Sequence, residues 1–149
     1  MISNLVHYLE DIPARTVLAS FSALDVYFDL PEARVLRVCT EADLVGLTKG
    51  LERLEYPGID GIDAVYSCPE GVILITCVDS VLDLPRSPIS ILNFAYDPAE
   101  MKFLDRCGVY NDLRQKVIRG IEGLFFSAGW KTVTDAAVLL SRYLRRDFT

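Results

Sequence analysis

The chain has 149 residues, of which 51% are hydrophobic, and this is sufficient to build one domain around one core. Its formal net charge of −6 argues against a general affinity for nucleic acid, because nonspecific binding requires lysine and arginine side chains to neutralise phosphates. No apolar run is long enough to cross a bilayer, and acids interrupt the N-terminus where a signal peptide is apolar, so we expect one cytoplasmic domain over residues 1–149 without membrane contact.

The first third of the chain combines helical and strand patterns. Residues 2–11 place apolar side chains at helical spacing and predict a helix, whereas residues 16–33 are ambiguous between strand and helix. The β-branched, alternating run "RVLRVCT" at 34–40 predicts a strand. A helix is predicted over residues 40–55, because Thr40 can cap it and leucines follow at helical spacing.

The remaining two thirds predict two strand hairpins followed by helices. The four strands are predicted over residues 62–68, 71–79, 87–97 and 101–105. Helices are predicted over residues 110–121, where Asn111 would be the cap, and over residues 130–146. Together these elements predict an α+β fold in which helices pack on a mixed, largely antiparallel sheet of about five strands and the C-terminal part is helical.

The four cysteines give no indication of a metal site. Cys39, Cys68, Cys77 and Cys107 contain no C-x-x-C pair, and His7 is the only histidine in the sequence. Three of these cysteines lie in predicted strands, so we expect buried and unreactive thiols.

Two segments of the second half carry motifs of a known family. The sequence "FAYDP" at 94–98, followed by "LDRCGVYNDLRQKVIR" at 104–119, resembles the class II tRNA nucleotidyltransferases, which add CCA, and the bacterial poly(A) polymerases. In those families the corresponding order is A-Y-D-P, then I-D-P-F-G-G, then D-L-x-x-K-V-I-R. The matching residues are Asp105, Gly108, Asp112, Leu113, Lys116, Val117, Ile118 and Arg119. The resemblance implies a nucleotidyltransferase head domain, with residues from about 124 to 149 similar to the start of the neck helices.

The same resemblance places the catalytic motifs on residues of the wrong chemistry. The metal-binding D-x-D falls on Val35 and Arg37, and the triphosphate-binding G-G-x-V-R-D falls on "FSALDV" at 21–26, with Phe21 and Ser22 at the glycines. Nucleotidyl transfer requires two divalent ions held by paired carboxylates on one strand face. A valine binds no ion, and Arg37 adds a positive charge that excludes magnesium and attracts phosphate.

Two further motifs are only partly retained. R-R-D-F-T-x-N-A falls on residues 86–95, where Arg86 and the threonine-like Ser90 remain, and E-D-x-x-R-x-x-R falls on residues 134–141, where Asp135 remains. The resemblance therefore leaves no catalytic residue. Its weak nucleotide-binding candidates are Arg37, Arg86 and Asp135, and independent of it the closely spaced Asp79 and Asp83 are weak candidates for a metal site.

These patterns predict a degenerate nucleotidyltransferase head domain without activity, which requires no cofactor and retains weak binding of phosphate or RNA. One alternative is an active RNA nucleotidyltransferase whose acids lie elsewhere and which uses Mg²⁺. Another is a scaffold that self-associates or binds a protein partner through its C-terminal helices, where the apolar "LFFSAGW" at 124–130 requires a packing surface.

Overall fold

The structure of the protein is a computed structural model. It describes residues 4–10, 12, 14–29, 34–42, 52–54, 61–115, 117–120 and 138. The chain divides into two compact units. The first unit comprises residues 1–85 and 95–104, and the second unit comprises residues 86–94 and 105–149.

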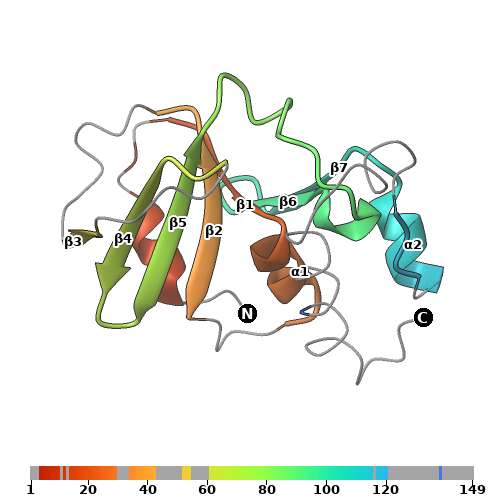
Figure 1. Cartoon of the computed structure of the whole chain (residues 1–149), viewed down its shortest axis with the longest axis horizontal. Coiled ribbons are helices and arrows are strands. Elements are labelled where there is room, and N and C mark those ends of the chain that lie inside the picture. Colours follow the sequence, from red (N-terminus) through yellow and green to blue (C-terminus); the bar gives the residue numbers. More distant parts are fainter. Residues whose placement is uncertain are drawn as a thin grey trace. The chain divides into compact units, whose positions relative to one another are not determined.

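A seven-stranded sheet in the order β3-β4-β5-β2-β1-β6-β7 forms most of the first unit (Figure 1). The strands are β1 Thr16–Ala19, β2 Val35–Thr40, β3 Glu52–Leu54, β4 Ala64–Cys68, β5 Gly71–Cys77, β6 Phe94–Asp97 and β7 Lys102–Asp105. Strand β2 pairs in parallel with β5, whereas β1–β2, β1–β6, β3–β4 and β4–β5 are antiparallel pairs. The prediction of a mixed, largely antiparallel sheet is confirmed, but the sheet has two more strands than expected.

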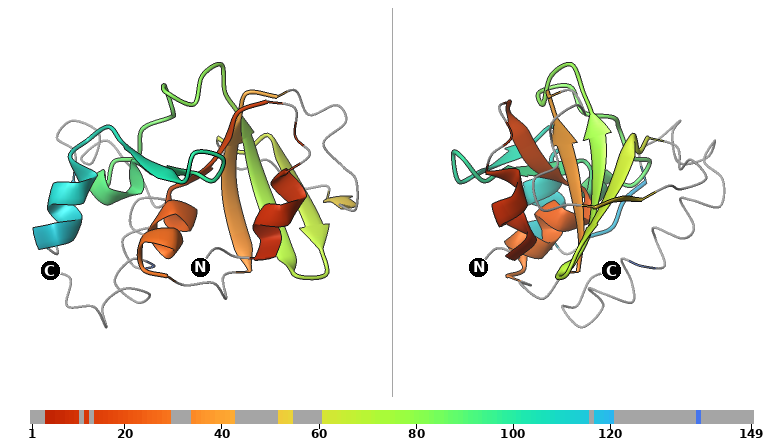
Figure 2. Two further views of the ribbon diagram at one scale, coloured as in Figure 1. Left: turned by 180° about the vertical axis from the view of Figure 1, so that it is seen from behind. Right: turned by 90° about the vertical axis from the view of Figure 1, so that its left-hand side faces the viewer.

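Four short helices accompany the sheet in the described part of the chain. They are the 3-10 helices η1 Asn4–Leu9 and η2 Ser90–Leu92 and the α-helices α1 Phe21–Tyr27 and α2 Val109–Gln115. In the side view, η1 and α1 lie on the same side of the strands β2, β4 and β5 (Figure 2). Among the described residues, no helix has the length and apolarity that crossing a membrane requires.

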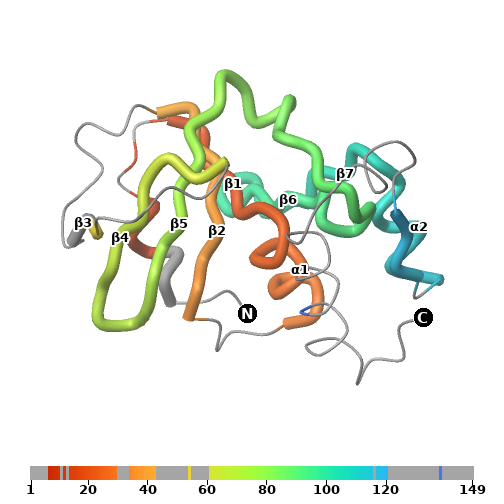
Figure 3. The backbone as a smooth tube through the Cα atoms, viewed as in Figure 1, coloured from red at the N-terminus to blue at the C-terminus, as the bar shows by residue number. Residues whose placement is uncertain are grey.

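The ambiguous segment 16–33 contains both a strand and a helix. Strand β1 ends at Ala19, and the chain continues into α1 through Ser20, whose φ is 58° (Figure 3). Five consecutive residues of α1, from Phe21 to Asp25, are buried. A helix that is buried on all sides has no amphipathic period, and this explains why the sequence did not distinguish it from a strand.

Strand β2 follows its predicted alternation. Leu36, Val38 and Thr40 are buried on one face, whereas Val35 is 48% exposed and Arg37 is half-buried on the other. Cys39, on the face of Arg37, is also buried, because it packs in an apolar cluster. That cluster contains Val17, Cys39, Val81 and Ala95. The sheet is therefore buried on both faces at the Thr40 end of β2 and more open at the Val35 end.

Three predicted elements are wrong in part. The helix predicted over 110–121 is α2, which ends at Gln115; residues 117–120 are not helical, and Gly120 forms an isolated β-bridge with Ile89. The helix predicted over 40–55 is contradicted at Glu52–Leu54, which is the strand β3, paired with β4 so that Leu54 lies opposite Val65. Residues 43–51 of that helix lie outside the described residues. The strand predicted over 87–97 begins only at Phe94.

The segment before Phe94 is η2 and its preceding turn, and the side chain of Asn93 stabilises it. The Asn93 amide donates to the carbonyls of Ser87, Ile89 and Ser90 at 3.0, 3.1 and 3.3 Å, and its oxygen accepts from Ser87 N at 2.8 Å. These side-chain bonds replace the ladder that an extended strand would form.

The last predicted helix and the apolar segment that precedes it are not tested. Of residues 121–149, the structure describes only Val138, so the helix over 130–146 and Asp135 lie outside the described residues. The same holds for "LFFSAGW" at 124–130.

Candidate functional site

The two residues on which the resemblance places the metal ligands, Val35 and Arg37, lie on β2 in the first unit. Val35 and Arg37 share one face of the strand, as their spacing predicts. Across the parallel pair, Val35 lies opposite Val72 of β5 and Arg37 lies opposite Leu74. This part of the sheet therefore presents apolar side chains and one guanidinium.

Arg37 is held by α1. Its backbone N donates to Ser22 Oγ at 2.7 Å, and its guanidinium carbon Cζ lies 5.0 Å from the centre of the Phe21 ring. This distance is within the range of a cation–π interaction. Phe21 was aligned with the first glycine of G-G-x-V-R-D, and Arg37 with the second acid of D-x-D. These two residues are thus in direct contact.

The surroundings of Arg37 do not fit a divalent cation. Mg²⁺ requires oxygen ligands, mainly carboxylates, whereas a valine and an arginine occupy the two motif positions. In the described part of the chain, no ion pair joins Arg37 to a carboxylate.

Three of the other candidate residues are exposed. Asp79 and Asp83, in the first unit, are both exposed, and Arg86 is exposed in the second unit. Within the described ranges, no three histidine, cysteine, aspartate or glutamate side chains gather as metal ligands would. The candidate Asp135 lies outside those ranges.

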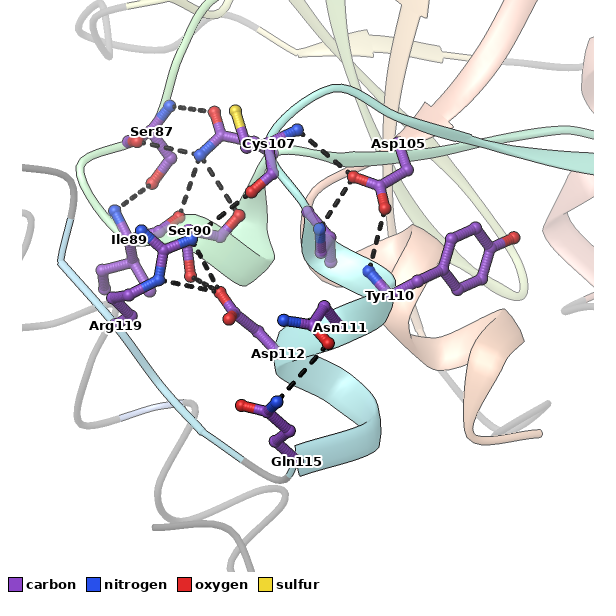
Figure 4. Close-up of polar contacts among 12 residues, drawn as sticks. Ser87, Ile89, Ser90, Asp105, Cys107, Tyr110, Asn111, Asp112, Gln115 and Arg119 are labelled. Carbon is purple, nitrogen blue, oxygen red and sulfur yellow. Dashed lines mark hydrogen bonds and ion pairs between the residues drawn. The ribbon is translucent and has the colours of Figure 1, made fainter.

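A second constellation lies in the second unit and joins residues from two motifs (Figure 4). Asp112 Oδ2 accepts a hydrogen bond from Ser90 Oγ at 2.6 Å and forms an ion pair with Arg119, whose Nη2 is 3.1 Å away. The backbone closes the arrangement, because Ser90 N donates to Arg119 O at 2.8 Å. We call these three residues the Ser90–Asp112–Arg119 network. The sequence identified each of them as a motif residue but gave no signal that they are bonded to one another.

Asp105 in the matched turn has a structural role as well. Its Oδ1 accepts from Val109 N at 2.8 Å and from Cys107 N at 3.2 Å, and its Oδ2 accepts from Tyr110 N at 2.9 Å (Figure 4). Asp105 therefore caps the start of α2. The predicted cap was Asn111, and this is wrong: its oxygen accepts from the Gln115 side chain at 3.5 Å.

The aspartate of the A-Y-D-P motif stabilises the turn between β6 and β7. Asp97 is buried, and its Oδ1 accepts from the backbone N of Ala99 and Glu100 at 3.0 and 3.3 Å. Its Oδ2 forms an ion pair with Arg15 Nε at 3.2 Å. The residue thus connects this turn to the segment before β1.

Only one of the four cysteines is buried as expected. Cys39 is buried, whereas Cys68, Cys77 and Cys107 are half-buried, and none of the four forms a disulfide. Burial, followed by the nearby Asp63 and Cys77, raises the pKa of the Cys39 thiol to about 11.

Cys39 is therefore expected to react slowly with thiol reagents. At pH 8 its thiolate fraction is roughly a hundredfold lower than that of an ordinary exposed cysteine, so a disulfide-exchange reagent should modify it last. Mass spectrometry of the labelled chain over time measures the order of modification. Labelling of Cys39 at the rate of Cys68 would contradict the assigned burial.

Comparison with known proteins identifies the fold. The sequence matches no protein-family profile and no curated protein. Among solved structures, a Thermotoga maritima CCA-adding enzyme complexed with tRNA-CCA matches with a TM-score of 0.65 and 19% identity over 95% of this chain. A CCA-adding enzyme with ATP matches with a TM-score of 0.64 and 17% identity over 97% of this chain. The fold is that of part of a CCA-adding tRNA nucleotidyltransferase.

The nucleotidyltransferase fold found here is a fragment of those larger enzymes. A tRNA nucleotidyltransferase complexed with a primer tRNA and an incoming ATP analog also matches, with a TM-score of 0.61 and 16% identity over 95% of this chain. The chain spans 36%, 38% and 45% of the lengths of the three solved chains. The resemblance to the head domain is confirmed for the fold, and the bacterial poly(A) polymerase resemblance stays a prediction.

Proposed function

We propose that the chain is a nucleotidyltransferase head-like domain that has lost metal-dependent nucleotidyl transfer and retains weak binding of phosphate-containing ligands. The observation that carries this proposal is the side chain of Arg37, which takes the position of a metal-binding acid and lies on Phe21. A divalent ion at about 4 Å from a guanidinium is disfavoured by about 8 kcal/mol at an effective dielectric constant of 20. One carboxylate at the same distance would only cancel that repulsion and leave no net attraction for the ion.

The backbone at Ser20 supports the loss of the glycines that bind the triphosphate in the family. A φ of 58° favours glycine, so the two motif glycines correspond best to Ser20 and Phe21, one residue earlier than the sequence indicated. In this register the motif arginine is replaced by Leu24, and its final acid is the buried Asp25. A side chain at Phe21 also occupies space where a glycine would let phosphate approach the backbone.

The distribution of charge supports a residual contact with RNA through the second unit. Residues 86–94 and 105–149 contain nine lysines and arginines and five acids, a net charge of +4, whereas the first unit contains six and sixteen, a net charge of −10. A local basic excess attracts phosphates even where the whole chain is acidic. Two of the solved neighbours were determined with tRNA, and the exposed Arg86 lies in this basic unit.

Calorimetric titration of ATP into the chain, with and without Mg²⁺, tests the proposal. We expect no Mg²⁺-enhanced binding and no transfer of labelled nucleotide to a tRNA that lacks its CCA end. The double variant Val35→Asp with Arg37→Asp is expected to gain Mg²⁺ binding, because it restores paired carboxylates on one strand face. Micromolar, Mg²⁺-dependent binding by the wild-type chain would instead support an active enzyme with acids at other positions.

A further inference from the structure

The guanidinium of Arg37 has a fixed position and hydrogen-bond donors that none of the described residues uses. The bond from Arg37 N to Ser22 Oγ fixes its backbone, and the Phe21 ring supports its head group at 5.0 Å. Phe21 is only 7% exposed, so this aromatic support is itself held within the fold. A guanidinium on an aromatic face keeps its five N–H donors directed outward in its own plane.

No described carboxylate uses those donors. Arg37 is half-buried and forms no ion pair or side-chain hydrogen bond with the described residues. An arginine in this state is suited to an oxyanion, because a phosphate group accepts two parallel N–H bonds from one guanidinium. The apolar neighbours Val35, Val72 and Leu74 on the same face offer no side-chain acceptor for these donors.

We infer that Arg37, supported by Phe21, forms a metal-independent binding site for a phosphate group. This inference rests on the proposed loss of the metal site and defines how the remaining site responds to Mg²⁺. Paired carboxylates need Mg²⁺ to attract a phosphate, whereas a guanidinium binds it directly. Mg²⁺ bound to the ligand neutralises the charge that Arg37 recognises, so Mg²⁺ should weaken binding here.

The surrounding charge sets the strength of the site. The first unit has a net charge of −10, which opposes the approach of any anion. At physiological ionic strength the Debye length is about 8 Å, so acids beyond that distance are largely screened, while the contact with Arg37 is not. We therefore expect a dissociation constant on the order of 1 mM. Binding should be stronger at moderate than at very low ionic strength.

The experiment uses the full chain and inorganic pyrophosphate as the probe, with binding followed by NMR in EDTA and in excess Mg²⁺. Wild type should bind at least about three times more weakly in Mg²⁺. Arg37→Gln should weaken binding about tenfold, and Phe21→Leu should weaken it a few-fold, because the donors remain but their support is lost. The matched control is Arg34→Gln, which removes the same charge from an exposed residue just before β2 and should change affinity less than twofold.

The outcomes separate the site from the proposed function. Equal affinity of wild type and Arg37→Gln would overturn the site at Arg37 but leave the loss of metal-dependent transfer intact. Enhancement of pyrophosphate binding by Mg²⁺ would overturn both. Thermal melting checks that each variant folds, and Arg37→Lys provides a second variant, which retains the charge but not the planar donors and should bind at an intermediate affinity.

Discussion

Replacing Gly71 with alanine is expected to destabilise the chain by about 3 kcal/mol. A Cβ at this position would lie 2.0 Å from the backbone oxygen of Arg34, and Gly71 has a φ of 156°. Neither backbone can yield easily, because Val72 N donates to Arg34 O at 2.8 Å where β5 begins beside β2. The midpoint of urea denaturation measures the effect.

Gly61→Ala is the matched control for this prediction. Gly61 also has a positive φ, of 81°, but no atom lies within 4 Å of the position of its Cβ. Its replacement should therefore cost only the conformational strain, about 1 kcal/mol. Equal destabilisation by the two substitutions would show that the contact with Arg34 does not constrain the start of β5.

The second large effect is expected for Asp112→Ala, which should destabilise the second unit by about 2 kcal/mol. Ser90 is fully buried and would lose the acceptor of its hydroxyl group, whereas Arg119 is 51% exposed and would be solvated again. The unpaired hydroxyl therefore accounts for most of the loss, and the ion pair for a smaller part.

Hydrogen exchange at the amide of Ser90 reports this effect locally, since that amide donates to Arg119 O. We expect exchange about thirtyfold faster in Asp112→Ala, which corresponds to about 2 kcal/mol. Asn111→Ala is the control, because Asn111 is exposed and has only a long bond to Gln115. Unchanged protection of Ser90 in Asp112→Ala would show that the network does not stabilise this turn.

The sequence predicted those elements whose pattern is local. The alternation from Val35 to Thr40 and the hairpin of β4 and β5 follow directly from apolar and turn residues. The start of the helix α2 was predicted, but the helix ends at Gln115 and not at residue 121. Its cap was not predicted, because Asp105 lies outside the helical pattern and precedes the first helical residue, Val109. The spacing of residues alone does not show which polar residue of a preceding turn caps a helix.

Elements decided by tertiary contacts were missed or misjudged. The strand β3 follows leucines at helical spacing, and its pairing with β4 decides its conformation. At the candidate site, alignment of motifs predicted that Val35 and Arg37 replace the acids. The contact of Arg37 with Phe21 could not be predicted, because it joins residues 16 positions apart whose side chains meet only after β2 packs beside α1.

The bonding of Asp97, Asp105 and the Ser90–Asp112–Arg119 network has a consequence for detecting similar chains in genomes. These residues match family motifs, yet each forms bonds that hold a turn or a helix end. A sequence search based on these residues therefore finds chains with the same fold but does not report whether they are catalytically active. Under the proposed function, active and inactive copies would be distinguished at Val35 and Arg37, whose side chains share the partly exposed face of β2.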